Sequence, residues 1–313
     1  MTVVKEPGPP LGAGPAPVLT ARSRPGETVI KALLRTAALL SVAITIGIIL
    51  AVLQPAIDFF RQVPLSDFLA MSDPAESGEL KPAVLPLLWG TALTTIVALL
   101  VAVPIGLAAA MYLSEYASKR ARKWLKPTVE LLAGVPSVVY GFFALSFVTP
   151  TLLNDILQLK VSLTNSLAAG LVLGVMIIPT IASLSEDSFS AVPMALRQGS
   201  LAMGANRMQT TVRVVLPAAL SGVAAAVVLG LSRAVGETMI VALAGGSAKS
   251  TSVDPTEGHQ TMTAFIAQTA AGENPPGSAE YNMLFAVALL LFVITFVMNM
   301  ISIRIVRRFR QAY

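Results

Sequence analysis

Residues 85–113 read LPLLWGTALTTIVALLVAVPIGLAAAMYL, a stretch without one charged side chain. About 20 apolar residues are enough to cross a bilayer as an α-helix. A membrane β-strand would instead alternate apolar and polar residues over about ten positions, and this stretch does not alternate. It therefore predicts a membrane-spanning helix.

The chain contains six charge-poor intervals of this kind. They span residues 36–60, 82–114, 131–154, 161–185, 214–248 and 281–303. Asp58 interrupts the first of them, and Arg233 and Glu237 interrupt the fifth. Of the 313 residues 55% are hydrophobic and 12% are charged, whereas about a quarter of a soluble domain is charged. The sequence therefore predicts an all-α integral membrane protein with six transmembrane helices.

Lysine and arginine are distributed unevenly around these intervals. Most of the 22 Lys and Arg residues fall in the N-terminal tail, residues 114–130, residues 186–213 and the C-terminal tail. Cytoplasmic loops of membrane proteins carry the excess of positive charge. Both termini are therefore predicted to be cytoplasmic, and the acidic loops between the other helix ends are predicted to lie outside.

The same intervals divide the chain into one large membrane domain with a preceding helix and two tails. The Pro- and Gly-rich N-terminus predicts a disordered cytoplasmic tail, because it offers no apolar face to bury. The predicted parts are a tail at 1–30, a first transmembrane helix at 31–60, an outer loop at 61–81, a membrane domain at 82–305 and a basic cytoplasmic tail at 306–313.

Composition excludes several kinds of site. The chain has no cysteine and a single histidine, His259, so it forms no disulfide, no zinc–sulfur site and no multi-histidine metal cluster. His259 stands beside Glu257 in a predicted outer loop and is expected to be solvated. Asp254 and Glu257 are interpreted as surface charges. No metal and no cofactor are expected to be bound by this chain.

A cytoplasmic loop between the fourth and fifth intervals, residues 190–217, is too polar to span a membrane. Its apolar residues recur near helical spacing and predict two short amphipathic helices, joined by a turn at 204–206 and ended by Pro217. An amphipathic helix here either lies on the lipid surface or docks into a groove of a partner, and its residues favour neither. The predicted polar face includes Arg197, Gln198, Asn206, Arg207 and Gln209.

This loop resembles the cytoplasmic coupling loop of ABC importer permeases. The pattern of that loop is EAA, three residues, Gly, nine residues, Ile, one residue and Leu-Pro. Gly204, Leu216 and Pro217 stand at the matching positions, whereas Gln-Gly-Ser at 198–200 replaces EAA and removes its acid. The resemblance implies that residues 190–217 couple the chain to an ATPase.

Three further stretches extend the resemblance. They are residues 85–117, LLAGVPSVVYGFFAL at 131–145 and LSRAVGETM at 231–239. Together they resemble the permeases of phosphate-specific ABC importers, and GETM after the arginine resembles the PstC type. The similarity covers roughly residues 60–305. It implies a type I importer permease fold (MetI-like), with a core of helices 2–6 plus one N-terminal helix, in the cytoplasmic membrane of a prokaryote.

Arg233 and Glu237 lie inside the fifth apolar interval. An arginine at the bilayer centre costs about 2.5–3.5 kcal/mol on insertion scales. The two residues could form an intrahelical pair that makes this cost tolerable, but Arg before Glu is the weaker order at this spacing. We therefore favour a substrate pathway. A guanidinium matches phosphate oxygens bidentately. Glu237 either holds the Arg233 side chain in one rotamer or accepts a hydrogen bond from a protonated phosphate oxygen.

Prolines fall inside three consecutive predicted helices. Pro104, Pro136 and Pro179 each remove a backbone donor, which membrane helices tolerate where neighbours or water satisfy the freed carbonyls. Three kinked helices are typical of a bundle around a cavity. Ser137 and Tyr140 place hydroxyl groups beside the break at Pro136, so both join the predicted substrate pathway.

The energy for phosphate import must come from another chain. Moving a dianion inward against about 150 mV costs about 7 kcal/mol. The sequence has no GxxxxGK[ST] loop to bind nucleotide phosphates, so ATP and Mg²⁺ are expected in a partner and the chain is not expected to be an enzyme. The resemblance implies four kinds of partner: a PstA-type permease, a dimeric PstB-type ATPase, a PstS-type external phosphate-binding protein and the lipid bilayer. No nucleic acid is expected.

Other functions fit the sequence less well. A permease for another oxyanion or a polar solute is the nearest alternative. A secondary anion transporter usually shows internal repeats or several intramembrane acids, and neither is evident. A membrane enzyme is disfavoured because the nearest other acids, Glu130 and Glu186, stand at the predicted cytoplasmic edge. The basic cluster at 119–126 is interpreted as a positive-inside signal first and a lipid-headgroup contact second.

Overall fold

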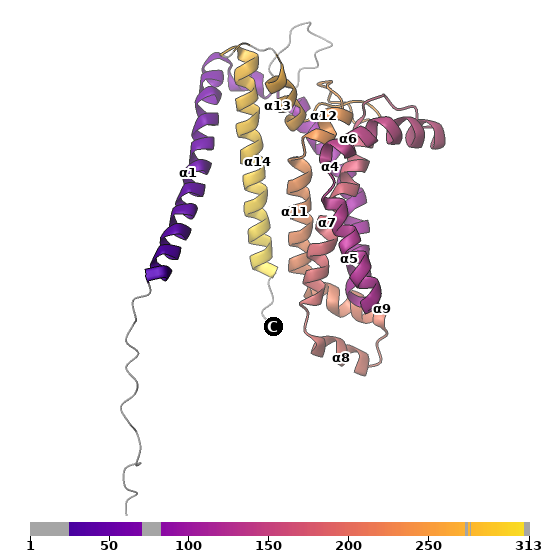
Figure 1. Cartoon of the computed structure of the whole chain (residues 1–313). Coiled ribbons are helices and arrows are strands. Elements are labelled where there is room, and N and C mark those ends of the chain that lie inside the picture. The colour runs from indigo at the N-terminus through magenta and orange to yellow at the C-terminus, as the bar shows by residue number, and fades with distance from the viewer. Residues whose placement is uncertain (1–24, 71–82, 273–274, 276, 310–313) are drawn as a thin grey trace, which may run out of the picture. The chain divides into compact units, whose positions relative to one another are not determined.

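The computed structural model describes residues 25–70, 83–272, 275 and 277–309, and every regular element within them is a helix (Figure 1). This confirms the predicted all-α class. The chain divides into two compact units, residues 1–50 and 51–313, and each is described by itself.

The described part of the first unit belongs to one long helix, α1 (Pro25–Gln62), which continues into the second unit. A proline suits the first turn of a helix, because its missing N–H would have no partner there. Residues 25–30 are therefore helical, although the sequence predicted them as part of the tail. The remainder of that predicted tail lies outside the described residues.

The second unit contains the end of α1 and all the remaining helices, of which η1, η2 and η3 are π-helical. They are α2 (Leu65–Phe68), α4 (Leu85–Met111), η1 (Tyr112–Tyr116), α5 (Lys119–Ala133), α6 (Ser137–Phe143), η2 (Ala144–Ile156), α7 (Ser166–Ser190), α8 (Met194–Ala202), α9 (Arg207–Thr210), η3 (Thr211–Val215), α10 (Leu216–Ala218), α11 (Leu220–Val235), α12 (Met239–Ala244), α13 (Met262–Ala271) and α14 (Ala279–Phe309).

Five described helices are long and apolar enough to cross a membrane. A sixth span is obtained if the two helical stretches Arg207–Ala218 and Leu220–Val235, which meet at 73°, count as one. The total agrees with the six predicted helices. The fifth predicted interval, 214–248, is nevertheless not one helix. It bends at its start, and a break at 236–238 separates α11 from α12.

The helices α4 and α7 form the most extensive helix pair of the described residues. Gly170 and Gly174 make a GxxxG pattern, which predicts a close helix contact. A Cβ atom on Gly170 would lie 2.6 Å from the Cβ of Val97, and one on Gly174 would lie 2.7 Å from the carbonyl oxygen of Ala98. The close contact is confirmed, and it makes α4 and α7 a tightly packed frame.

The three prolines behave differently from one another. Pro104 and Pro179 lie inside α4 and α7, which continue through them as helices. Pro136 ends a true break and occupies the N-cap position of α6. Besides the bend at Ala219, the described chain thus has breaks within predicted spans at 134–136 and at 236–238.

Both ends of the helical bundle carry short elements. Figure 1 shows α8 and α9 at one end of α7 and α11, the end predicted to be cytoplasmic, and α12 and α13 at the other. A segment joining α12 to α13 folds back onto the end of α7 that is predicted to lie outside, where the backbone N–H groups of Ser166 and Leu167 donate to the carbonyls of Glu257 and Pro255. This predicted outer loop is therefore an ordered part of the domain.

Candidate functional site

Arg233 lies in the last turn of α11, where a cation is favoured by the partial negative charge of the helix end. Its side chain is exposed, and Nη1 is 3.4 Å from the hydroxyl oxygen of Thr180 on α7. One turn earlier, Gly230 lets α11 approach α7 closely, since a Cβ there would lie 2.9 Å from Ile181. The guanidinium therefore stands beside the α7–α11 contact.

Glu237 lies in the break between α11 and α12. Its Oε1 accepts hydrogen bonds from the backbone N–H of Met239 at 3.0 Å and of Ile240 at 3.4 Å, so the carboxylate caps the first turn of α12. The intrahelical pair weighed for Arg233 and Glu237 is not formed among the described residues. Its physical requirement, a continuous helix, is missing because α11 ends at Val235.

The break is held from a second side by α13. The Thr263 hydroxyl, which is buried, donates to the backbone carbonyl of Glu237 at 2.7 Å. Thr261 caps α13 by accepting from the N–H of Ala264 at 3.1 Å. The side chains of Glu237 and Thr263 thus bind backbone groups at this break, as a break inside a membrane would require.

Ser137 and Tyr140 both lie on α6, at the other break. The Tyr140 hydroxyl donates to the carbonyl of Leu132 at 2.8 Å and so satisfies a carbonyl at the end of α5. Helix α6 packs on α12, because a Cβ on Gly141 would lie 2.9 Å from Leu243. No hydrogen bond in the described chain joins Ser137 or Tyr140 to Arg233, so their place in the pathway stays a prediction.

The loop at the predicted cytoplasmic end has the predicted helix–turn–helix shape. Gly204 has a φ of +87°, a conformation that favours glycine, and forms the turn after α8. Asn206 starts α9 with a capping box: its side chain accepts from the N–H of Gln209 at 2.8 Å, and the Gln209 side chain accepts from the N–H of Asn206 at 3.0 Å. Leu216 and Pro217 begin α10, just before the 73° bend.

Helix α8 presents an uncharged outer surface. Gln198 is exposed, as are Met194, Leu201 and Met203. Arg197 was predicted to belong to this polar face, but it turns inward and pairs with Glu115. The outer surface of α8 therefore offers a partner amide and apolar side chains and no charge.

A cluster of charges at the same end was not predicted. Glu186, completely buried, is paired with Arg122, and Lys126 lies 2.6 Å from its second oxygen. Lys126 also contacts Asp187 at 3.1 Å. Two of the positive-inside residues thus neutralise a buried acid and tie α5 to α7. These partners lie about 60 positions apart in the sequence, so no local pattern signals the pairing.

The prediction for His259 was wrong. Its side chain is completely buried: Nε2 is 2.9 Å from the Ser252 carbonyl, and Nδ1 is 3.0 Å from the Ser166 hydroxyl. The burial follows from the folding of the outer loop onto α7. Asp254 does lie at the surface, and hydrogen bonds from Thr256 lower the pKa of its carboxyl.

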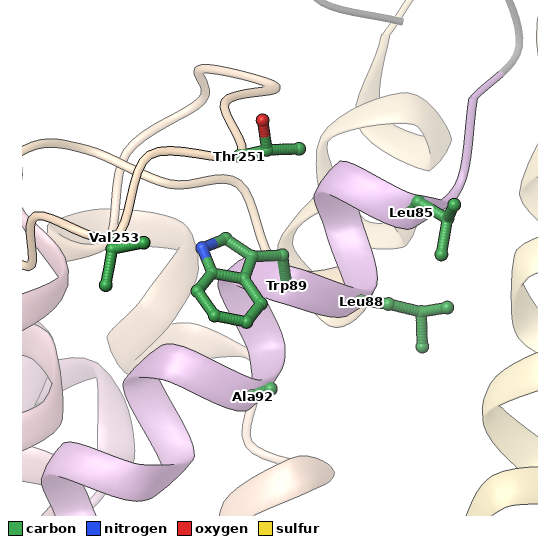
Figure 2. A pocket seen from close by; sticks show the side chains of 6 residues that line it. All are labelled: Leu85, Leu88, Trp89, Ala92, Thr251 and Val253. Atoms are coloured by element: carbon green, nitrogen blue, oxygen red, sulfur yellow. The ribbon is translucent and has the colours of Figure 1, made fainter. Parts of the chain in front are cut away.

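One pocket opens at the outer end of α4, with a volume of about 440 Å³ (Figure 2). The indole N–H of Trp89 donates to the Ser252 carbonyl at 2.7 Å, which fixes one wall of the pocket against the outer loop. No charged side chain lines it, so it suits hydrocarbon better than an oxyanion. Its lining residues are Leu85, Leu88, Trp89, Ala92, Thr251 and Val253.

Comparison with known proteins places these features in a family. A family profile described as "Binding-protein-dependent transport system inner membrane component" matches residues 102–311. The probable ABC transporter permease protein YqgH of Bacillus subtilis is 42% identical over 69% of this chain and 69% of its own length. The phosphate transport system permease protein PstC 1 of Mycobacterium tuberculosis is 35% identical over 72% of each chain. PstC of Mesorhizobium japonicum is 34% identical, over 69% of this chain and 70% of its own.

Solved structures resemble the fold. A chain of a bacterial ABC transporter involved in the import of alginate aligns with a TM-score of 0.62 at 17% identity, over 92% of this chain and 100% of that chain. A chain of the inward-facing MetNI methionine ABC transporter aligns with a TM-score of 0.54 at 21% identity, over 73% and 94%. The MetI-like core expected from the sequence is therefore confirmed.

Proposed function

Since the chain belongs to the binding-protein-dependent transport system inner membrane components, we propose that it is the PstC-type permease subunit of an ATP-driven phosphate importer. In this role it passes inorganic phosphate from an external binding protein to the cytoplasm by alternating access. The observation that carries the proposal is Arg233, an exposed guanidinium at the end of α11 that no carboxylate in the described chain neutralises.

A guanidinium suits this task because its planar fork of N–H donors matches two phosphate oxygens at once. Arg233 lies in the last turn of α11, beside the non-helical backbone at 236–238, and substrate sites in membrane transporters often lie at such helix breaks. Arg233 needs no partner within the chain if its partner is the cargo. A single arginine also holds an anion weakly enough to release it.

Glu237 is proposed to select the protonation state of the cargo. Both of its hydrogen bonds to α12 are made by Oε1. In the described chain Oε2 makes none, so it is available to a phosphate oxygen that still carries a proton. Sulfate has no such proton at neutral pH. Glu237→Gln is expected to lower the preference for phosphate over sulfate in a competition assay, and an unchanged preference would reject the selecting role.

The energy is proposed to enter through the loop at 190–217. Import of a dianion needs about 7 kcal/mol at about 150 mV, and this chain has no nucleotide-binding loop. We assign ATP hydrolysis to a PstB-type dimer that docks on α8 and α9, with a PstA-type second permease and a PstS-type binding protein completing the assembly. The chain lies in the cytoplasmic membrane of a prokaryote with both termini in the cytoplasm.

Phosphate uptake in cells tests the proposal through three variants. Arg233→Gln is expected to reduce uptake at least tenfold, because the charge and the fork are both lost. Arg233→Lys keeps the charge and should retain a partial rate. Arg304→Gln, which removes another exposed arginine from α14, is the matched control and should import normally. Membrane levels are measured in parallel. Import at the full rate by Arg233→Gln would refute the pathway.

A permease for another oxyanion is the second candidate, since the guanidinium would serve any tetrahedral anion. The similarity to two phosphate permeases favours phosphate. Competition of labelled phosphate uptake by sulfate, molybdate and arsenate separates the two. Uptake that sulfate or molybdate suppresses and phosphate does not would favour the alternative.

A further inference from the structure

The segment formed by α8, the Gly204 turn and α9, called the coupling segment below, has little apolar contact with the membrane helices. No residue of α8 is buried, and its contacts are chiefly with α9 and η3. Figure 1 shows α8 at the very end of the second unit. Apolar packing of α8 therefore cannot carry a displacement of this helix into α4 or α7.

Arg197 adds a side-chain connection to those made by the backbone, which joins α8 to α7 and α9 to η3. It is the one charged residue of α8, and its side chain is only 15% exposed. Nη2 lies 3.0 Å from Oε1 of Glu115 and donates to the Phe189 carbonyl at 2.6 Å. One guanidinium group thus joins the coupling segment to two other parts of the chain.

Both partners of Arg197 belong to the α4–α7 frame. Glu115, whose side chain is 12% exposed, lies in η1, the π-helical continuation of α4, and it also accepts from the Ser114 hydroxyl at 3.0 Å. Phe189 is completely buried in the last turn of α7. A displacement of Arg197 therefore acts on the ends of the two helices that the glycine contacts pack together.

The surroundings make this contact harder to break than a surface ion pair. Exposed pairs are weak because water screens and replaces them. Here both side chains are largely shielded, so separating them would leave two charges poorly solvated. Part of the guanidinium is already without a partner: its Nε is buried and makes no hydrogen bond within the described chain. The geometry therefore favours movement of α8 and α4 together.

We propose that Arg197 is a positioning residue that transmits the motion of the coupling segment to α4 and α7, through the Glu115 carboxylate and the Phe189 carbonyl. This inference rests on the proposed function, because it supposes an ATPase that moves α8. Without the guanidinium, the uncharged outer surface of α8 still docks. The displacement then no longer reaches the frame, and ATP is hydrolysed without import.

The test uses the complete four-part importer in proteoliposomes, with ATP hydrolysis and phosphate uptake measured on the same preparation. Arg197→Gln and Glu115→Gln are each expected to keep ATP hydrolysis within twofold of wild type. The phosphate moved per ATP should fall at least fivefold. Arg197→Lys, which keeps a cation and N–H donors for both the Glu115 carboxylate and the Phe189 carbonyl, should retain at least half of the wild-type ratio.

Glu27→Gln is the matched control. It removes an acid from an exposed ion pair with Lys31 on α1, 2.7 Å long, and should leave the ratio unchanged. An unchanged ratio in Arg197→Gln would overturn the inference. Failure of Arg197→Gln, Glu115→Gln and Arg197→Lys to assemble would also overturn it, because the ion pair would then serve folding alone.

A cargo-independent readout separates this inference from the proposed function. The chain has no cysteine, so Thr180→Cys is a single labelling site beside Arg233. ATP should change the labelling rate of this thiol when Thr180→Cys is the only substitution, and should not do so when Arg197→Gln is added. Suppose that the wild-type chain imports no phosphate, and yet ATP changes the thiol labelling of Thr180→Cys only while Arg197 is present: only the proposed function fails. If the wild-type chain imports phosphate and ATP changes the thiol labelling equally with and without Arg197→Gln, only the inference fails.

Discussion

The contact between α4 and α7 allows a stability prediction with a matched control. In Gly174→Ala the new Cβ would lie 2.7 Å from the backbone carbonyl oxygen of Ala98, about 0.7 Å closer than ordinary contact at 3.4 Å. A carbonyl oxygen cannot rotate away as a flexible side chain can. The two helices must therefore separate along the contact, and overpacking of this kind costs about 1–3 kcal/mol.

The control is Gly47→Ala in α1, where no heavy atom lies within 4 Å of the added Cβ. Both substitutions gain the better helix propensity of alanine, about 1 kcal/mol. The difference in stability between the two variants therefore isolates the cost of the contact. Thermal unfolding of the purified protein in detergent should give Gly174→Ala a midpoint several degrees below that of Gly47→Ala. Equal midpoints would show that α4 and α7 are not pressed together, and the frame assigned to Arg197 would lose its basis.

Three further predictions concern charges and caps. Glu186→Gln should destabilise the protein by up to about 3–5 kcal/mol, because Arg122 loses its carboxylate partner and Lys126 keeps only Asp187. Asp187→Asn at an exposed pair should cost under about 1 kcal/mol, and chemical denaturation of both variants measures the difference. Asn206→Ala should destabilise α9 by about 1 kcal/mol, because the capping box is lost. Amide hydrogen exchange should become faster in α9 alone, and unchanged exchange there would contradict the role of the cap. The lowered pKa of the Asp254 carboxyl stabilises the predicted outer loop above the unfolded carboxyl pKa, and this stabilisation is lost as pH falls through the folded value. Protease sensitivity of the loop should rise in acid, and Thr256→Val, which removes the hydroxyl donor and keeps the backbone N–H, should weaken that dependence.

The long helices could be predicted from the sequence because lipid imposes a strong and local demand. A run of apolar residues can cross a bilayer only as a helix or as part of a closed barrel, and for this reason α4, α7 and α14 could be predicted as helices. Gly170 and Gly174 were equally informative, since a glycine pair at this spacing has a direct steric meaning.

The break in the fifth predicted helix could not be predicted in the same way. Residues 236–238 stand between two stretches that both favour helix, and only Gly236 hints at an end. The decisive groups are distant in sequence: Thr263 binds the free carbonyl of Glu237 across 26 positions. An i,i+4 spacing indicates a shared face only while the helix continues, and for Arg233 and Glu237 it does not.

The burial of single polar residues could not be predicted from the sequence either. A lone histidine in a loop of Gly, Ser and acids reads as solvated, yet His259 is enclosed when its loop folds over Ser166. From the sequence, Glu186 was placed at the cytoplasmic edge and Arg197 on the polar face of an amphipathic helix. Each is instead shielded by an opposite charge from another helix, a tertiary event without a local signature.

The cap on α12 has a consequence for how long cargo can stay. The two amide groups at the start of this helix, those of Met239 and Ile240, already hold an anion, the carboxylate of Glu237. If phosphate follows the proposed route, the negatively charged carboxylate of Glu237 competes with it for these two N–H groups. An oxyanion can settle on these amides only by displacing that carboxylate. Under the proposed function the site would therefore hold its cargo briefly, and tight capture would fall to the proposed external binding protein.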